Sequence, residues 1–579
     1  MANRIAQTIA VALCAGSCSC ASAQITFQTV ALTGDQLPSG AIDAEFASFE
    51  TPVINESGVV AFKAIITGPD VIPSNDAGIW SGLPGSLEAV AVESEAAAGA
   101  GAGVVYGDLL TPTGLNLTLN DADQLGFIGE LAGAGVTVLT RDALWVGKPT
   151  ALSLLARGGD FAPGTADFSY LFLSVNPTLN VGGVAAFGSI LTGDGVTSSN
   201  DAGLWSGSPG AVMLTAHEGD PAADAPIGQL YGNPTIQAIS ETNTVVFRGD
   251  LTGAGVTTAN DSAIWTGVPG SLVIAAREGD AAPGTAVGVT FRSFGFLFPD
   301  INASNEIAIY GELTGPGIGT LNDRGIWTGT TGSLSPAIRA GDPVVGGLPG
   351  EIVTNFGAPV INKDGTVAVS AATFVSPSAR SGIFVGTPGG LAPVALEGQS
   401  APNLPASIAF GSLFSQAIAL SNTGRVVFQS SLTGAGVSPA NDVAIFAQDS
   451  SGSLVLVARE GDSFDVDDSA AVDLRVIESL LVQRGSGGTD GRSRGINDSN
   501  QLVFQAAFTD GSQGVFIATL IAPPCLADTN GDGFVTPADF SAWVAAFNTM
   551  APQCDQNGDG LCTPADFSAW VANYNAGCP

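Results

Sequence analysis

Two acidic segments near the C-terminus have the residue types and the spacing that bind a hard cation. In the segment 528–539, oxygen-bearing side chains occupy positions 1, 3, 5 and 12, and glycine occupies position 6. The segment 555–566 repeats this pattern 27 residues later. Calcium takes six to eight oxygen ligands, including a backbone carbonyl at position 7, and the glycine permits the sharp turn around the ion. The sequence therefore predicts two bound Ca2+ ions. Their predicted ligands are the side chains of Asp528, Asn530, Asp532, Asp539, Asp555, Asn557, Asp559 and Asp566 and the carbonyls of Phe534 and Leu561.

A short helix is predicted after each loop. Pro537 and Pro564 suit the first helical turn, where a missing amide proton costs nothing. Large apolar residues then recur at i, i+3, i+4 and i+7, which places them on one helix face. These residues are Phe540, Trp543, Val544 and Phe547 in the first helix and Phe567, Trp570, Val571 and Tyr574 in the second. We expect the two faces to pack together, with part of the Trp surface left for a partner.

The tail resembles a dockerin, because a calcium loop with only an exiting helix is duplicated and closed by Asp at position 12. Pro523-Pro524 precludes a helix before the first loop. The cysteines around the loops make the tail similar to the GC-type dockerin of exported bacterial proteins. The resemblance implies paired EF-hand-like loops that dock to a cohesin-like receptor or act as a sorting and anchoring signal. Loop positions 10 and 11 are Pro-Ala in both copies, whereas cellulosomal dockerins often carry polar residues there, which argues against an ordinary cellulosomal cohesin.

The cysteines lie at the two ends of the chain. Of the seven, Cys14, Cys18 and Cys20 precede residue 24. The other four belong to the tail and predict two disulfides, for which three pairings are open. They are Cys525, Cys554, Cys562 and Cys578. Because the long middle region contains no cysteine, packing alone must hold it together.

The N-terminus has the pattern of an export signal. Arg4 is followed by a mostly apolar run, and Ala21-Ser22-Ala23 forms an A-x-A cleavage site before Gln24. Lipoprotein processing at Cys18 or Cys20 is the alternative. No later segment has eighteen uninterrupted apolar residues, so no transmembrane segment is expected. We predict a signal peptide at 1–23, a repeat domain at 24–521 and a dockerin at 522–579, in a protein that is secreted, extracellular or attached to the cell surface.

Charge excludes two classes of partner. The chain has 53 acidic and 18 basic residues, a net charge of -35. Nucleic acids and anionic membranes both require Lys and Arg, so neither is an expected partner. Charged residues make up only 12% of the chain and Gly numbers 77, which favours short strands and tight turns over long helices.

An N-x-x-G-x-x-A-F pattern recurs eight times at intervals close to 60 residues, except for the last interval, which carries an insertion. Each copy fits four strands separated by turn residues, and an array of such units predicts an all-β, eight-bladed propeller over residues 25–520. The eighth copy ends after its third strand, at 514–517, and the missing segment occurs at 29–35. An N-terminal strand should therefore close the ring. An open β-solenoid is the alternative. The copies start at Asn55, Asn120, Asn180, Ser240, Asn302, Asn362, Ser421 and Asn497.

The repeats resemble a family of bacterial exported proteins named for tandem N-x-x-G-x-x-A-F repeats. The resemblance covers nearly all of the middle region and implies an architecture but no activity.

The repeated side chains are interpreted as structural. The Asn should shape a turn, although it could also bind an ion or a sugar. The aromatic position should pack between blades, with a ring of sugar-stacking Trp as the alternative. The residues at this aromatic position are Trp80, Trp145, Trp205, Trp265, Trp327, Phe384, Phe446 and Phe516. Each A-R-E-G-D segment contains an Arg with an Asp three residues later, and we expect this pair to form an ion pair between blades. A catalytic array of such pairs is the alternative. The pairs begin at Arg157, Arg277, Arg339 and Arg459.

Residues for catalysis are few. The single histidine, His217, replaces the Arg of the repeat, so His-based triads and His-rich metal sites are not expected. No acidic pair stands out for glycoside chemistry. The segment 465–494 departs most from the repeat, and a unique binding loop is expected there. The leading hypothesis is a non-enzymatic binding or scaffold protein with polysaccharide as a candidate ligand. The alternative is a carbohydrate-active enzyme, a polysaccharide lyase or glycosidase, carried by a dockerin.

Overall fold

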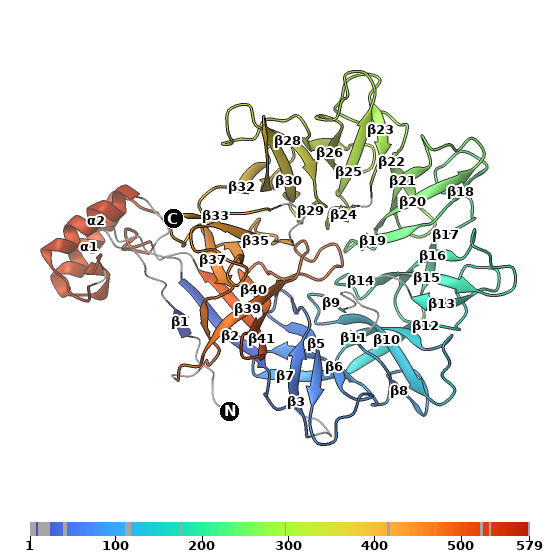
Figure 1. Cartoon of the computed structure of the whole chain (residues 1–579), viewed down its shortest axis with the longest axis horizontal. Coiled ribbons are helices and arrows are strands. Elements are labelled where there is room, and N and C mark those ends of the chain that lie inside the picture. Colours follow the sequence, from blue (N-terminus) through green and yellow to red (C-terminus); the bar gives the residue numbers. More distant parts are fainter. Residues whose placement is uncertain are drawn as a thin grey trace.

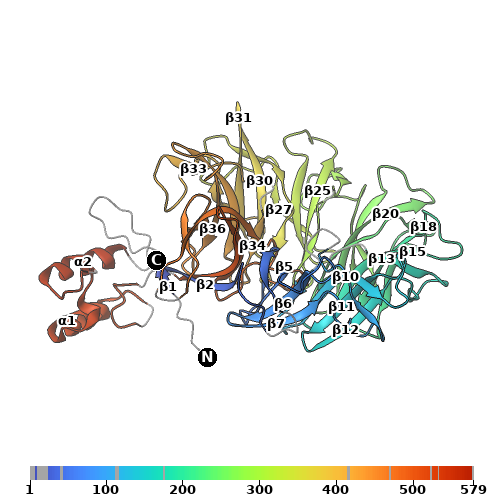
Figure 2. The same ribbon diagram turned by 60° about the horizontal axis from the view of Figure 1, so that its bottom comes forward.

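The computed structural model describes residues 7–9, 24–38, 43–110, 117–173, 177–295, 297–413, 417–468, 471–521, 525–531, 534–557 and 559–576. The described strands form eight antiparallel sheets that follow one another around a ring, and two helices lie outside the ring (Figure 1). Figure 2 shows the same ring from another direction, with the helices beside its closing blade. The prediction of an eight-bladed β-propeller is confirmed.

Each blade has an innermost strand in two pieces, followed by three further strands toward the outside. In blade 1 these are β3 (Glu45–Phe49), β4 (Val53–Ile54), β5 (Val60–Thr67), β6 (Ala77–Leu83) and β7 (Ser86–Val92). Both β3 and β4 pair with β5, and β6 joins β5 to β7. The short second pieces of neighbouring blades contact one another around the centre of the ring.

The remaining strands repeat this order. Blade 2 has β8 (Val104–Tyr106), β9 (Leu117–Leu119), β10 (Leu125–Gly133), β11 (Asp142–Lys148) and β12 (Ala151–Arg157), and blade 3 has β13 (Ser169–Leu173), β14 (Thr178–Leu179), β15 (Ala185–Thr192), β16 (Ala202–Gly207) and β17 (Met213–His217). Blade 4 has β18 (Gln229–Tyr231), β19 (Thr235–Ile239), β20 (Val245–Gly253), β21 (Ser262–Gly267) and β22 (Val273–Arg277), and blade 5 has β23 (Thr290–Ser293), β24 (Asp300–Ile301), β25 (Ile307–Thr314), β26 (Arg324–Gly329) and β27 (Ser335–Arg339). Blade 6 has β28 (Ile352–Phe356), β29 (Val360–Ile361), β30 (Val367–Val375), β31 (Ser378–Gly386) and β32 (Ala392–Leu396), and blade 7 has β33 (Ile408–Phe410), β34 (Ile418–Leu420), β35 (Val426–Gly434), β36 (Val443–Gln448) and β37 (Leu454–Arg459).

Blade 8 joins the two ends of the repeat region. It contains β38 (Ser463–Asp465), β39 (Leu474–Val482), β40 (Gln501–Phe508) and β41 (Gln513–Ile521), and its outer strand is β2 (Gln24–Leu32). Strand β2 pairs with β41 from Gln24 opposite Ile521 to Leu32 opposite Gly514. The predicted closure by an N-terminal strand is therefore confirmed. A further strand, β1 (Gln7–Ile9), pairs with the outer edge of β2.

The repeated aromatic residues form the cores between blades. Phe247 faces Trp265 across β20 and β21, and their rings stack with centroids 5.4 Å apart. Tyr231 from the innermost strand meets Trp265 edge-on at 5.2 Å. Trp265 is fully buried, and its indole Nε1 donates to the carbonyl of Ala223 in the preceding linker. The packing interpretation is correct, because the five repeated Trp side chains are inaccessible to a sugar.

The repeated Asn does more than shape a turn. In blade 1, Oδ1 of Asn55 accepts from the amides of Ser57 and Val59, as expected of a turn residue. Its Nδ2 also donates to the carbonyl of Asn120, the equivalent residue of blade 2. Four other Asn side chains make the same bond to the next blade, and Asn497 returns it to the carbonyl of Asn55, 3.1 Å away. The Asn side chains thus link successive blades around the ring.

The repeated Arg makes a different contact from the one expected. In the described residues, Nε of Arg157, Arg277 and Arg459 donates to a carbonyl of the same blade, and none of these Arg forms an ion pair with the following Asp within 4.0 Å. The prediction of an inter-blade ion pair is therefore wrong. His217 takes the Arg position, with Nε2 3.0 Å from the carbonyl of Asn200, so it is a substituted structural residue.

Candidate functional site

The predicted calcium loops lead into two short helices with matching starts. These are α1 (Pro537–Thr549) and α2 (Pro564–Ala576), and a single 3-10 turn, η1 (Pro552–Cys554), lies between them. Thr536 is the N-cap of α1, and its side chain accepts from the amide of Ala538. The Asp539 carboxylate accepts in return from the Thr536 amide at 2.8 Å, which completes a capping box.

The second helix begins in the same way. The amide of Thr563 donates to Oδ2 of Asp566 at 2.7 Å, and the Thr563 hydroxyl accepts from the amide of Ala565. Asp539 and Asp566 thus occupy position 12 of the predicted loops and the third position of the helices at the same time. The sequence predicted the first role only, although Thr three residues before an acidic residue is itself a capping signal.

The two carboxylates also reach back to the start of their loops. Oδ1 of Asp539 accepts from the amide of Asn530 at 3.1 Å, and Oδ1 of Asp566 accepts from the amides of Gln556 and Asn557 at 2.9 and 3.2 Å. Burial alone would raise the pKa of each group, but the amide hydrogen bonds outweigh it and hold both pKa values below the ordinary range. Both groups are therefore anionic at neutral pH.

The first half of each loop curls around its position-1 carboxylate. Oδ1 of Asp528 accepts from the amide of Gly531 at 2.8 Å, and Oδ2 of Asp555 accepts from the amide of Gly560 at 2.8 Å. Gly560 has φ of 80°, as the turn at position 6 requires. In the second loop, Oδ1 of Asn557 also accepts from the amide of Asp559. Asp532 and Gly533 lie outside the described residues.

This donor set fits a hard cation. Each loop combines ionised carboxylates, an Asn amide oxygen and backbone carbonyls, which are the groups that Ca2+ prefers over nitrogen or sulfur. Within the described parts of the chain, no three His, Cys, Asp or Glu side chains form a ready metal cluster. Asn557 and the carbonyls of Phe534 and Leu561 would therefore have to supply ligands beside the acidic groups.

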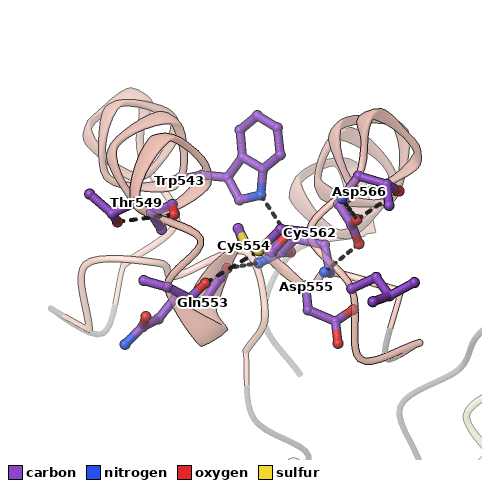
Figure 3. Close-up of a disulfide and its surroundings, with 12 residues drawn as sticks. Trp543, Thr549, Gln553, Cys554, Asp555, Cys562 and Asp566 are labelled. Carbon is purple, nitrogen blue, oxygen red and sulfur yellow. Dashed lines mark hydrogen bonds between the residues drawn. A yellow bond between two sulfur atoms is a disulfide. The ribbon is translucent and has the colours of Figure 1, made fainter.

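A disulfide ties the second loop to the 3-10 turn that precedes it. Cys554 in η1 is bonded to Cys562 in the second loop (Figure 3). Cys525 is disulfide-bonded as well, and Cys578 lies outside the described residues. Nε1 of Trp543 donates to the carbonyl of Cys554 at 3.1 Å, so this disulfide is also tied to α1.

The exposed face of the helix pair differs from the expected one. Trp543 and Trp570 are each only 5% exposed. Phe540 packs on Trp570 with centroids 5.2 Å apart, and Phe567 packs on Trp543 at 5.6 Å. The Phe side chains remain 40% and 44% exposed. The surface left open is therefore formed by Phe540 and Phe567 and not by the Trp rings, because each Trp reaches farther into the helix interface.

The unique segment of the propeller fills its centre. In blade 8 the break in the innermost strand is extended to residues 483–495, which we call the plug (the loop entering the middle of the ring in Figure 1). The plug forms hydrogen bonds with the innermost strands of all seven other blades or with the breaks in those strands. The hydrogen-bonded pairs, with the plug residue first, are Arg494 and Ile54, Ser493 and Leu117, Gly491 and Leu179, Asp490 and Ile239, Arg492 and Pro299, Arg484 and Ala358, and Gly485 with both Ile418 and Leu420.

Glycine allows the plug backbone to approach the strands. A Cβ on Gly491 would lie 2.7 Å from Cγ2 of Ile239 and 3.1 Å from the amide nitrogen of Leu179, and its φ is 71°. A Cβ on Gly487 would overlap the Asn422 side chain. The sequence analysis located this departure from the repeat but did not predict that it enters the ring. The sequence feature that could have indicated the plug is the alternation of Gly with Arg and Asp in an otherwise β-rich chain.

The plug brings several charged groups into the ring. Arg494 is 2% exposed and pairs with Glu56 at 2.8 Å and with Asp121. Nη1 of Arg492 lies 3.4 Å from Oδ1 of Asp300. Burial raises the pKa of the Asp300 carboxyl well above its usual range, and the neighbouring Asp490 raises it further.

Residues 19–118 and 112–525 match the model of a family of unknown function, DUF7453. The chain belongs to this family. No curated protein matches the sequence. The match ends at the first described residue of the tail, so the helices and most of the loops lie beyond it.

Three solved structures illustrate what the chain is similar to. The β-propeller domain of the Trilobed protease from Pyrococcus furiosus is 10% identical over 72% of this chain and 100% of that chain, with a TM-score of 0.33. The polysaccharide lyase Uly1 is 9% identical over 74% and 94%, with a TM-score of 0.34. Puromycin hydrolase is 12% identical over 83% and 62%, with a TM-score of 0.33. Similarity at this level does not bear on activity.

Proposed function

We propose that this is an exported binding or scaffold protein whose propeller is displayed by a calcium-dependent, dockerin-like tail. The observation that carries the proposal is the pair of loop–helix units in which Asp539 and Asp566 are kept ionised beside an oxygen-rich turn. The residues that would hold the two Ca2+ ions are those predicted from the loop spacing. Bound calcium would draw the oxygen groups of each loop together and couple the loops to the helices that they precede.

Two observations support export. The tail contains the Cys554–Cys562 disulfide, and such bonds persist in oxidising compartments. Cleavage before Gln24 would remove β1 and leave β2 as the outer strand of blade 8, so that its order would match that of the other blades. In the described residues, no helix is long and apolar enough to cross a membrane. We accordingly place the domain boundaries at 1–23, 24–521 and 522–579.

The repeated side chains of the propeller have structural roles, and this supports a binding or scaffold role for the propeller. The Asn side chains link blades, the Trp side chains fill cores and the Arg side chains bond to carbonyls. The exposed pair Phe540 and Phe567 would suit a receptor for the tail, since apolar residues at the centre of an interface contribute most of the binding free energy. Polysaccharide is retained as a candidate ligand of the propeller.

Calcium titration of the full-length protein tests the proposal. Isothermal titration should show two sites in the native chain, one in Asp528→Ala or Asp555→Ala alone, and none in the double variant. Asp43→Asn, an exposed acidic residue of the propeller, is the matched control and should keep both sites. Absence of calcium binding by the native chain would overturn the tail assignment. Turnover of any polymer in a polysaccharide-degradation screen would instead overturn the non-enzymatic role of the propeller.

A further inference from the structure

The three arginines of the plug have different surroundings. Arg494 is buried and paired with two carboxylates. Arg492 is partly exposed and ion-paired with Asp300, and its Nη2 donates to the carbonyl of Pro299 at 2.8 Å. Arg484 is exposed, and its Nη2 donates to the carbonyl of Ala358 at 3.3 Å. In the described parts of the chain, no carboxylate lies within 4.0 Å of the Arg484 guanidinium. Arg484 therefore keeps most of its donors available.

Arg484 and Arg492 are neighbours at the centre of the ring. The carbonyls that they contact, those of Ala358 and Pro299, lie at equivalent breaks in the innermost strands of adjacent blades. Burial lowers the pKa of Arg484, and the charge of Arg492 lowers it further. Arg484 is thus exposed to solvent and yet close enough to other protein groups to lose part of its hydration. Arginine remains charged even so.

The acidic groups near this pair lie against Arg492. Asp300 and Asp490 are fully buried, and Nη1 of Arg492 lies 3.4 Å from an oxygen of Asp300 and 3.8 Å from an oxygen of Asp490. Among the described residues, neither these nor any other carboxylates lie that close to the Arg484 guanidinium. Arg484 therefore carries a positive charge that is not ion-paired, in a chain whose net charge is -35.

We propose that Arg484, with Arg492 beside it, binds an oxyanion, a carboxylate or sulfate group, at the centre of the propeller. The planar guanidinium presents a fork of donors that matches both groups. The oxyanion could be a small ion or the acidic group of a sugar unit in a polymer. Phe298, which is 53% exposed and precedes Pro299 in sequence, offers an aromatic surface beside the site that only the sugar would use. This site deepens the binding role proposed for the propeller, and it does not depend on the calcium loops.

Titration of the full-length protein with three probes tests the site. The probes are sodium sulfate, an oligogalacturonate and a neutral dextran oligosaccharide of equal length, and binding is measured by calorimetry. We expect saturable binding of the anionic probes and none of dextran. Arg484→Gln should weaken it at least about tenfold, because charge-assisted hydrogen bonds are lost. Arg425→Gln is the matched control, since Arg425 also donates to a single backbone carbonyl, that of Ser450, outside the plug.

The outcomes separate the two sources of the anion. Tighter binding of oligogalacturonate than of sulfate, weakened by Phe298→Ala for the oligomer alone, assigns an acidic glycan. Equal binding of both probes, unchanged by Phe298→Ala, assigns a small ion. Failure of the native chain to bind either anion, or an equal loss in Arg425→Gln, would overturn the site. Melting temperatures close to that of the native chain would confirm that both Arg variants are folded. Repeating the titration with a chelator present distinguishes a failure here from a failure of the tail.

Discussion

The propeller and the tail treat their acidic side chains in opposite ways. In the propeller, burial and, to a smaller extent, nearby carboxylates raise the pKa of Glu93 and Glu278 to about 7. In the tail, amide hydrogen bonds hold the pKa values of Asp539 and Asp566 below their usual range despite burial. The propeller thus buries carboxyl groups that favour the protonated form, whereas the tail keeps its carboxylates charged. This difference is consistent with the proposal that the tail binds a cation.

The two regions also differ in what holds them together. The propeller contains no cysteine and depends on aromatic cores, on the Asn links between blades and on closure by β2. The tail is too small for a large core and contains disulfide bonds and predicted metal loops instead. Loss of closure should therefore affect only the propeller, and loss of calcium should affect only the tail.

The largest effect is expected from removing the closing strand. A variant that lacks residues 24–38 would leave the edge of β41 unpaired and would remove Val30 and Ala31 from the core. Its melting temperature should fall by about 10 °C or more, measured by calorimetry. A variant that lacks residues 525–579 is the control and should keep the propeller transition. An unchanged transition without β2 would show that the ring does not need closure.

Chelation of calcium should have the next largest effect and should be confined to the tail. Without the ion, the oxygen groups of each loop lose the partner that would hold them together, so α1 and α2 should lose their fixed starting turns. Hydrogen exchange followed by mass spectrometry should show faster exchange at 537–549 and 564–576, with the strands of the propeller unchanged. If the helices keep full protection in chelator, the disulfides are sufficient to hold the tail and its folding is not coupled to calcium.

A single methyl group in the plug should have a smaller effect. Gly491→Ala places a Cβ against Ile239 at a position with φ of 71°, so the variant combines steric overlap with backbone strain. We expect the free energy of unfolding to fall by about 1–3 kcal/mol. Gly511→Ala is the matched control, because its φ is 87° but no atom lies within 4 Å of the added Cβ. Equal losses in the two variants would mean that the plug does not pack tightly against the strands.

The sequence was most informative where one pattern repeats. Eight copies of the same motif predicted the blades, and the split last copy predicted which strand closes the ring. The plug was not predicted, because its bonds join residues 484–494 to strands as far away as Ile54, and no local period records such contacts. The Asn links were missed for the same reason, since a turn residue and an inter-blade donor have the same sequence pattern. In the tail, spacing predicted the ligand set, but the exposure of Phe540 in place of Trp543 depended on how two helices pack.

The response to pH should be the smallest effect and should distinguish the propeller from the tail. Since the folded pKa of Glu278 is raised to about 7 from 4.5, its contribution to stability is present below pH 4.5 and is lost as the pH rises through 7. The melting temperature of the propeller should therefore decrease between pH 5 and pH 8. The lowered pKa values of Asp539 and Asp566 have the opposite sign, so the tail should lose stability only under strongly acidic conditions.

Replacing the carboxyl group of Glu278 shows how much of the pH response of the propeller comes from this residue. Glu278→Gln stays neutral at every pH and can donate to Asp261, so this variant should melt at a higher temperature than the native chain at pH 8 and close to it at pH 5. Glu397→Gln is the control at the same repeat position, where the carboxylate accepts from the Ser381 hydroxyl at 2.6 Å and Arg380 takes the place of Asp261 in the sequence. It should gain no stability at pH 8. If Glu278→Gln is destabilising at both pH values, the buried carboxyl pair stabilises the blade as an ordinary hydrogen bond, and the proposed contrast with the tail is wrong.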